Sequence, residues 1–212
     1  MITGIVSSGN LVATGIALVQ SKGSHLGSGT SHSITWDASP TSGNKLILAA
    51  YRLNSSTTFT GPSGWTSNLT VGAGSSLGLY WWEKQSDGTE TTVTVTSDIT
   101  AGFGLCGFEV SGLVTGTAKD VSSNGTNATV TSKSTGTTAT LAQANEFAVS
   151  LVCVNGTSGG SEAWTNSFTL EHNIARGWSG YKILSATTGV ETTASWTTSR
   201  FANAGVVTYK GA

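Results

Sequence analysis

The sequence predicts an all-β protein, a two-sheet antiparallel jelly-roll sandwich of about eight strands built from an internal duplication. Three observations support this fold class. Apolar and polar residues alternate in short segments, and helical periodicity is absent throughout. Turn residues separate these segments, with 28 glycines and two prolines in 212 residues. Finally, the stretch 44–112 is followed by a diverged copy of itself at 145–211.

The duplication is visible as an ordered series of shared landmarks. Residues 44–51 read Asn-Lys-Leu-Ile-Leu-Ala-Ala-Tyr, and residues 145–152 read Asn-Glu-Phe-Ala-Val-Ser-Leu-Val. The later landmarks, in the same order in both copies, are Trp65 and Trp164, Tyr80 and Tyr181, Glu90 and Glu191, and Gly112 and Gly211. Four strands with one apolar face cannot bury that face alone. We therefore expect one domain over residues 1–212, with halves of about 1–112 and 113–212; two tandem domains and an immunoglobulin-like arrangement are the alternatives.

The first half opens with an aliphatic segment and ends with a strand that contains a cysteine. Strands are expected at residues 11–20, 33–37, 45–53, 76–84, 89–97 and 103–111. A loop rich in Gly, Ser and His is expected at 23–31, with turns at 40–43 and 62–64. Period two is clearest at 89–97, where valines alternate with threonines.

The second half repeats this order after a polar tract. The tract 122–140, rich in Ser, Thr, Gly and Asn, is expected to hold one or two exposed strands in its middle. The strands that follow are expected at residues 146–154, 167–172, 178–184, 191–198 and 204–210. Since no strand alternates with a helical pattern, the sheets are expected to be antiparallel.

The composition argues against several classes of partner. Only 10% of the residues are charged, and the formal net charge is -1. A nucleic-acid groove or a patch for anionic membranes needs clustered Lys and Arg, so neither partner is expected. The N-terminus lacks a basic region, and Thr14 and Gly15 interrupt the apolar run 11–19, which therefore matches neither a signal peptide nor a membrane span. Synthesis in a cytoplasm is expected.

The two cysteines, Cys106 and Cys153, each lie in an apolar segment with apolar neighbours at alternate positions. Free cysteine is among the most buried residue types, so we expect two buried thiols. A disulfide is the alternative if the two strands face each other.

No catalytic constellation stands out, and the protein is expected not to be an enzyme. Glycoside hydrolases use paired carboxylates, for which the candidates are Glu83, Asp87, Glu90, Glu109 and Glu191. Glu90 and Glu191 hold the same place after a hairpin, as turn-flanking polar residues do. Glu109 lies within an apolar strand and is expected to be paired across strands or to face outward. A G-x-S-x-G nucleophile elbow is missing from the sequence.

Metal and cofactor sites are not expected either. His25, His32 and His172 lack the i+2 or i+4 pairing of metal ligands, and no Cys or Asp lies at a suitable spacing. The Gly-rich segments 23–29 and 156–160 do not connect a strand to a helix, so they form no phosphate cradle.

Tryptophans are the better indication of binding. Trp65 and Trp164 match between the copies, which indicates a shared packing role. Trp81 and Trp82 must point to opposite faces of one strand, so one is expected in the core and the other partly exposed.

A second group of residues lies where the copies differ. Trp178 has no matched aromatic and is close in sequence to His172 and Arg176. An exposed tryptophan can stack on a sugar ring or fill a partner's pocket, although it can also simply cover a sheet edge. The candidate binding residues are therefore Trp82, Trp178, His172 and Arg176.

Five motifs of the first copy occur in a fixed order. They are Gly-Asn-Lys-Leu-Ile-Leu-Ala at 43–49, Pro-Ser-Gly-Trp-Thr at 62–66, Tyr80 with Glu83, Gly-Thr-Glu-Thr-Thr-Val-Thr-Val-Thr at 88–96, and Phe-Glu-Val-Ser-Gly at 108–112. In this combination the chain resembles the jelly-roll domains of tailed-bacteriophage virion proteins, found in head decorations, fibres and tail appendages. The resemblance covers residues 43–112 and reaches the rest of the chain through the repeat.

The resemblance implies a structural protein on the exterior of the virion, made in the host cytoplasm. It implies a homo-oligomer that binds other capsid or tail proteins, with no catalytic residue and no cofactor. The same sandwich also serves carbohydrate binding and host adhesion. A glycan-binding module is therefore the alternative, whereas a secreted glycan hydrolase would require a carboxylate pair that the sequence does not show.

Overall fold

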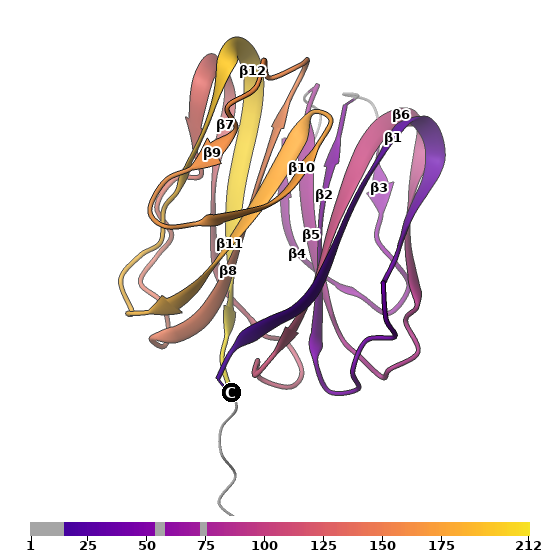
Figure 1. Ribbon diagram of the computed structural model, residues 1–212, viewed down its shortest axis with the longest axis vertical. Coiled ribbons are helices and arrows are strands. Elements are labelled where there is room, and N and C mark those ends of the chain that lie inside the picture. The colour runs from indigo at the N-terminus through magenta and orange to yellow at the C-terminus, as the bar shows by residue number, and fades with distance from the viewer. Residues whose placement is uncertain (1–14, 54–57, 73–75) are drawn as a thin grey trace, which may run out of the picture.

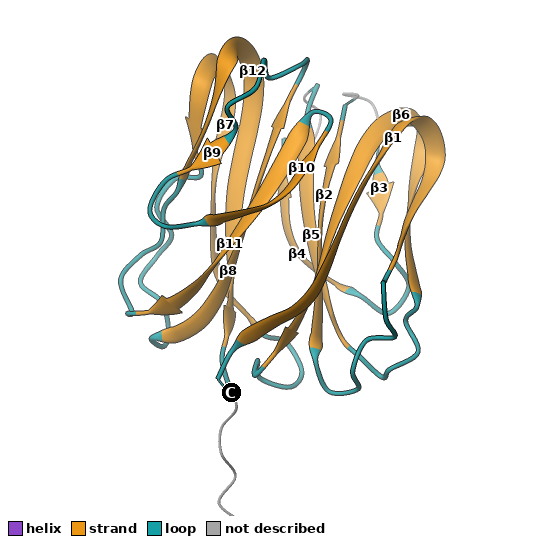
Figure 2. Cartoon of the chain, viewed as in Figure 1, coloured by secondary structure: helices purple, strands orange, loops and turns teal. Residues whose placement is uncertain are grey.

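The computed structural model describes residues 15–53, 58–72 and 76–212, which form two antiparallel β-sheets packed face to face (Figure 1 and Figure 2). The all-β sandwich predicted from the sequence is confirmed. Within the described residues every regular element is a strand. None of these residues forms a helix that could span a membrane.

The first sheet belongs entirely to the first half of the chain. Its strands are β1 (Ala17–Thr35), β2 (Lys45–Arg52), β3 (Phe59–Thr60), β4 (Thr66–Val71), β5 (Gly78–Gln85) and β6 (Thr92–Ser111). Their order is β1-β6-β2-β5-β4, with the short β3 paired to β6. The last strand of this half therefore lies between the first two.

The second sheet repeats this arrangement with the second half of the chain. Its strands are β7 (Lys119–Ser134), β8 (Asn145–Val154), β9 (Ala163–Trp164), β10 (Thr169–Ile174), β11 (Gly177–Ser185) and β12 (Thr193–Lys210). Their order is β7-β12-β8-β11-β10, with β9 paired to β12. Strand for strand this is the order of the first sheet, as expected of duplicated halves.

The connectivity differs from the one that the name jelly roll implies. Successive strands of a jelly roll alternate between two sheets, because it is built from Greek keys. Here the chain completes one sheet before it begins the other. The described residues form twelve strands, including two that are only two residues long. Periodicity shows which faces of a strand are buried but not which strands pair, so the strand order could not be predicted.

Strands β1 and β6 are longer than the sequence indicates. Residues 23–31, expected as a loop, lie inside β1, and the expected strands 89–97 and 103–111 merge into β6. Residues 11–14 of the expected first strand lie outside the described residues. Gly, Ser and His are not strong strand formers, but β6 pairs with β1 along most of its length and supplies the backbone partners.

The long strands also bend. The register of β1 against β6 shifts, as it does at a β-bulge, between Leu18 and Gln20, between Leu26 and Gly29, and between Gly29 and Ser31. Bulges bend a strand and increase its twist. The C-terminal end of β1 and the N-terminal end of β6 curve back beside β3, over the outer face of their own sheet (Figure 1).

A shared core joins the inner faces of the two sheets. Trp81 of β5 and Phe108 of β6 belong to one buried cluster with Phe147 of β8 and Tyr209 of β12. All four side chains are fully buried. This cluster holds the two halves together through apolar contact.

Each sheet has a further core on its outer face, beneath the bent strands. In the first half Leu48 and Trp82 pack with Val95 of β6, and in the second half Trp178 packs with Trp196 of β12. Strand β2 therefore lies between two cores, and all 8 of its residues are buried. This position explains why its sequence is a nearly continuous apolar run.

The expected buried thiols are confirmed. Cys106 and Cys153 are free, and both lie in the shared core. Burial disfavours the thiolate and raises the pKa of Cys106 to about 12.

Candidate functional site

Two of the four candidate binding residues are buried. Trp82 is 5% exposed and stacks on Tyr80, with ring centroids 5.7 Å apart. Trp178 is 1% exposed and packs edge-on against Trp196 at 5.4 Å. The expectation that these tryptophans are exposed is therefore wrong. The bent ends of β6 and β12 cover them, and the sequence contains no local indication of that bend.

The other two candidates, His172 and Arg176, lie where β10 meets the first sheet. His172 Nδ1 lies 2.9 Å from Ser179 Oγ, and its ring packs edge-on against Phe108 with centroids 5.3 Å apart. Burial lowers the pKa of His172 to about 4. The Arg176 side chain is exposed, and its backbone N–H donates to the Tyr51 hydroxyl at 3.4 Å.

Hydrogen bonds between β1, β2 and β10 close this edge of the sandwich. The Tyr51 hydroxyl donates to Ile174 O at 2.7 Å and lies 3.0 Å from His25 Nδ1. Because the Tyr51 proton is used on Ile174, His25 Nδ1 donates to the Tyr51 oxygen. Ser21 Oγ donates to Glu171 Oε1 nearby. These bonds join the two halves, and their residues are called the seam from here on: Ser21, His25, Tyr51, Glu171 and Ile174. They are too far apart in sequence for a local pattern to predict their contact.

The three histidines do not share a site. His25 bonds Tyr51 in the seam, His32 packs edge-on against Phe103 at 5.4 Å, and His172 lies beside β11. Across residues 15–53, 58–72 and 76–212, no three His, Cys, Asp or Glu side chains gather as a metal site requires.

The hydrolase candidates inside the strands are hydrogen-bonded within the fold. Glu109 is fully buried and accepts from Gln20 Nε2 of β1 and from Asn44 Nδ2, both at 2.6 Å. The expected cross-strand pairing of Glu109 is thus confirmed. Glu83 is 2% exposed and accepts from the Ala118 N–H at 3.0 Å. It fixes the segment that connects the two halves.

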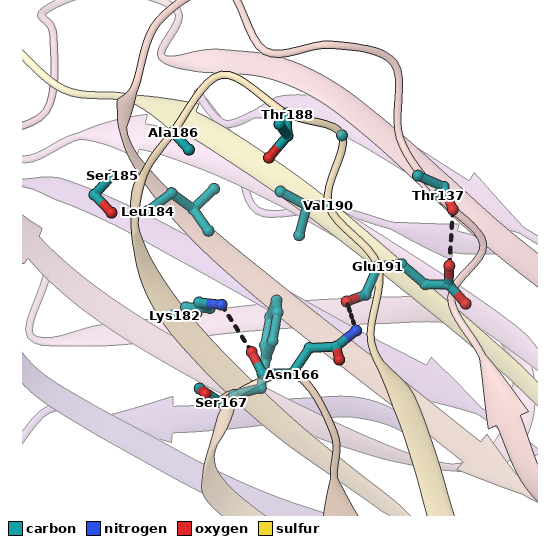
Figure 3. A pocket seen from close by; sticks show the side chains of 12 residues that line it. Thr137, Asn166, Ser167, Lys182, Leu184, Ser185, Ala186, Thr188, Val190 and Glu191 are labelled. Carbon is teal, nitrogen blue, oxygen red and sulfur yellow. Dashed lines mark hydrogen bonds between the residues drawn. The ribbon is translucent and has the colours of Figure 1, made fainter.

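A pocket opens on the outer face of the second sheet, between β11 and the turn that precedes β12 (Figure 3). Its volume is about 480 Å³, which lies in the range of small-molecule sites. The floor consists of Phe168, Leu184 and Val190, which belong to one outer core cluster. These side chains are only 6 to 8% exposed, so the pocket has an apolar base.

Hydrogen bonds hold the polar rim of the pocket in place (Figure 3). Lys182 Nζ donates to Asn166 O at 2.8 Å, and Asn166 Nδ2 donates to Glu191 O at 2.8 Å. Thr137 Oγ1 donates to Glu191 Oε2 at 2.8 Å, and Ser134 Oγ donates to Glu191 Oε1 at 2.7 Å. The hydroxyl bonds from Ser134 and Thr137 lower the pKa of Glu191. Four chain segments are thereby fixed around one cavity.

One wall of the pocket is a left-handed turn. Asn166 and Ser167 have φ angles of 56° and 59°, and the Phe168 N–H donates to Thr165 O at 3.2 Å. Asn adopts this left-handed conformation readily, whereas for Ser167 it costs about 1–2 kcal/mol. Such strained residues gather at binding sites, where a fixed geometry is useful.

The matching position in the first copy is arranged differently. Glu90, the counterpart of Glu191, forms an ion pair with Lys84 at 2.6 Å and accepts from Ser86 Oγ at 2.9 Å. Neutral hydroxyls, in contrast, hold Glu191. The rim of the pocket is therefore a feature of the second half, where the repeats have diverged.

Comparisons with known proteins do not identify the chain. No family model matches it, and no curated protein is similar enough to count as a relative. Among solved structures, the Mu homology domain of Fcho1 from Danio rerio, with a bound Eps15 peptide, has a TM-score of 0.23 and 11% sequence identity to it. The match covers 72% of this chain, which spans 62% of that structure. A likeness at this level carries no argument about function.

Proposed function

We propose that this protein is a non-enzymatic structural component of a tailed-phage virion, displayed on the exterior of the capsid or tail. It is made in the host cytoplasm and assembles as a homo-oligomer. It binds other capsid or tail proteins through strand edges and loops.

The observation that supports this proposal is the hydrogen bonding of the buried carboxylates in the motifs. The motifs that resemble phage virion domains lie in strands and turns of the sandwich, and their carboxylates bind other parts of the fold. Glu109 accepts from Thr41 N–H and from two side-chain amides, and Glu83 accepts from two backbone N–H groups. Buried carboxylates satisfied in this way support a rigid scaffold.

The strand edges offer surfaces for assembly. Strand β7 ends the order of the second sheet and is 16 residues long. An edge strand has unpaired backbone groups that can bind a strand from another chain. An oligomer or a neighbouring virion protein can therefore add to this edge.

The test is whether the chain belongs to a particle. Electron microscopy of particles from the native source should show this sandwich at a defined symmetry position. Purified protein should cosediment with particles that lack it. The proposal fails if the protein is missing from particles and does not bind them on addition.

A second candidate function is glycan binding in host adhesion. The buried Trp82 and Trp178 no longer support it, but the pocket with its apolar floor and polar rim does. A glycan array probed with the full chain tests it, and the absence of any signal would remove this candidate.

A further inference from the structure

We infer that the pocket formed by Phe168, Leu184 and Val190 with Asn166, Lys182 and Glu191 binds one ring of a neutral saccharide. This inference rests on the second candidate function, glycan binding, and specifies its site and ligand class.

The charges on the rim indicate a neutral ligand. Lys182 would oppose a cation, and Glu191 would oppose an anionic sugar. Both groups keep unused hydrogen-bonding capacity, since the ammonium group has three N–H donors and each carboxylate oxygen has two lone pairs. Lys182 uses one donor on Asn166 O, and each Glu191 oxygen accepts one hydroxyl. A sugar has hydroxyls around its ring that both donate and accept, so one of them can bind either group.

The floor matches the apolar face of a sugar ring. A pyranose presents C–H groups on its faces and hydroxyls around its edge. The exposed parts of Phe168, Leu184 and Val190 form the base of the cavity, below the polar rim. A ring lying on this base would keep its hydroxyls at the level of Lys182 and Glu191. The volume of about 480 Å³ accommodates one ring together with ordered water.

The site is formed before a ligand arrives. The bonds of Lys182 and Glu191 connect the Asn166–Ser167 turn to β11 and to the turn that precedes β12, and Thr137 donates to the Glu191 carboxylate. A rim fixed in this way loses little conformational freedom on binding, which favours affinity for a small ligand.

The experiment is a titration of the isotopically labelled full chain with methyl glycosides of glucose, galactose, mannose and N-acetylglucosamine, followed by amide NMR spectra. At least one glycoside should shift the amides of Ser167, Thr188 and Gly189, with a Kd of about 1–10 mM. Glu191→Gln and Lys182→Met should each weaken binding about tenfold, because each removes a charge-assisted hydrogen bond.

Two further variants keep the test decisive. Glu90→Gln changes the matching turn of the first copy and should leave the affinity unchanged. Ala186 is an exposed residue of the pocket wall. Ala186→Trp should fill the pocket and abolish binding without disturbing the core.

Three results would overturn the inference: no shifts at about 100 mM glycoside, shifts at residues away from the pocket, or binding of methyl glucuronide in preference to the neutral sugars. A positive glycan array combined with any of these would leave glycan binding in place and reject only this site. The cosedimentation test of the virion role does not depend on the glycan array or on the titration of this pocket.

Discussion

Tyr80 and Tyr181 hold the same place in the two sequence repeats but face opposite sides of their sheets. Tyr80 stacks on Phe59 at 4.9 Å in the outer core of the first sheet. Tyr181 stacks on Phe147 at 5.4 Å, against the core shared by the two sheets. Because side chains alternate along a strand, a shift of one residue moves a side chain to the other face. In the fold Tyr181 therefore takes the place of Trp81 rather than that of Tyr80, since Trp81 pairs with Ala49 and Tyr181 pairs with Val149, both on the shared core.

This difference predicts unequal effects of removing the two hydroxyls. The Tyr80 hydroxyl accepts from the buried Arg52 Nε at 2.8 Å. Tyr80→Phe should therefore lower the free energy of unfolding by about 1–3 kcal/mol. Tyr181 is partly exposed, and Tyr181→Phe should cost no more than about 0.5 kcal/mol. Urea denaturation of both variants measures the difference, and equal losses would contradict the assignment of faces.

The environment of His172 predicts a loss of stability in mild acid. Burial holds its pKa at about 4, whereas the unfolded chain has a value of about 6.5. The unfolded state therefore binds the proton first, so the contribution is present above pH 6.5 and is lost as the pH falls from about 6.5 to 4. We expect a loss of about 2 kcal/mol over this window.

The contribution of His172 is isolated by comparison with His172→Gln. The difference in free energy of unfolding between the two proteins, measured by urea denaturation, should shrink from about pH 7.5 to pH 4.5. A difference that does not change with pH would show that His172 is not the titrating group.

Glu146 predicts the opposite dependence on pH. It is fully buried, and its carboxyl lies beside Asp120, Thr208 and the backbone of Gln143. Burial and the nearby Asp120 raise its pKa to about 7, above the value of about 4.3 in unfolded chains. The folded state therefore favours the protonated form, and stability is lost as the pH rises from about 4.3 through 7.

Replacement of this carboxyl should reverse that loss. Glu146→Gln is expected to stabilise the protein by about 2 kcal/mol at pH 8 and to have little effect at pH 4.5. Thermal unfolding followed at both pH values checks this. A destabilisation at pH 8 would mean that the charged carboxylate is well satisfied.

Glu109 is expected to be a structural carboxylate. Glu109→Gln keeps a single acceptor oxygen where Gln20, Thr41 and Asn44 now donate, and should destabilise by about 1–3 kcal/mol. Asp37→Asn, which breaks an exposed ion pair with Lys22, is the control and should have little effect. Loss of a measurable glycan hydrolysis in Glu109→Gln, without loss of stability, would contradict the structural role.

The two cysteines are expected to be unreactive in the native protein. Cys106 and Cys153 are fully buried, and burial raises the pKa of both thiols. The thiolate is the reactive form, so a thiol reagent at about pH 8 should label neither residue until the chain is unfolded. Mass spectrometry should then show two labels. Rapid labelling of the folded protein would contradict the packing of the shared core.

The sequence by itself determined the fold class and the faces of many strands. The alternation at 103–111 predicted Cys106 and Phe108 on one face and Leu105 on the other, and these residues do lie in different cores. The matched turns also predicted that Glu90 and Glu191 hold equivalent places, but the expected hairpins are wrong, because β2 separates β5 from β6 and β8 separates β11 from β12. Such features are local, because each strand records in its own residues which of its faces is buried.

Only the tertiary structure decided which strands pair, which tryptophans are covered, and where a cavity lies. Trp82 is buried because β6 bends over it, where the register of β6 against β1 shifts. The pocket brings Thr137, Asn166 and Lys182 beside the turn that holds Glu191, although each is an ordinary polar residue in its own segment. These relationships arise from contacts between residues far apart in the chain, and no local pattern records the partner of such a contact.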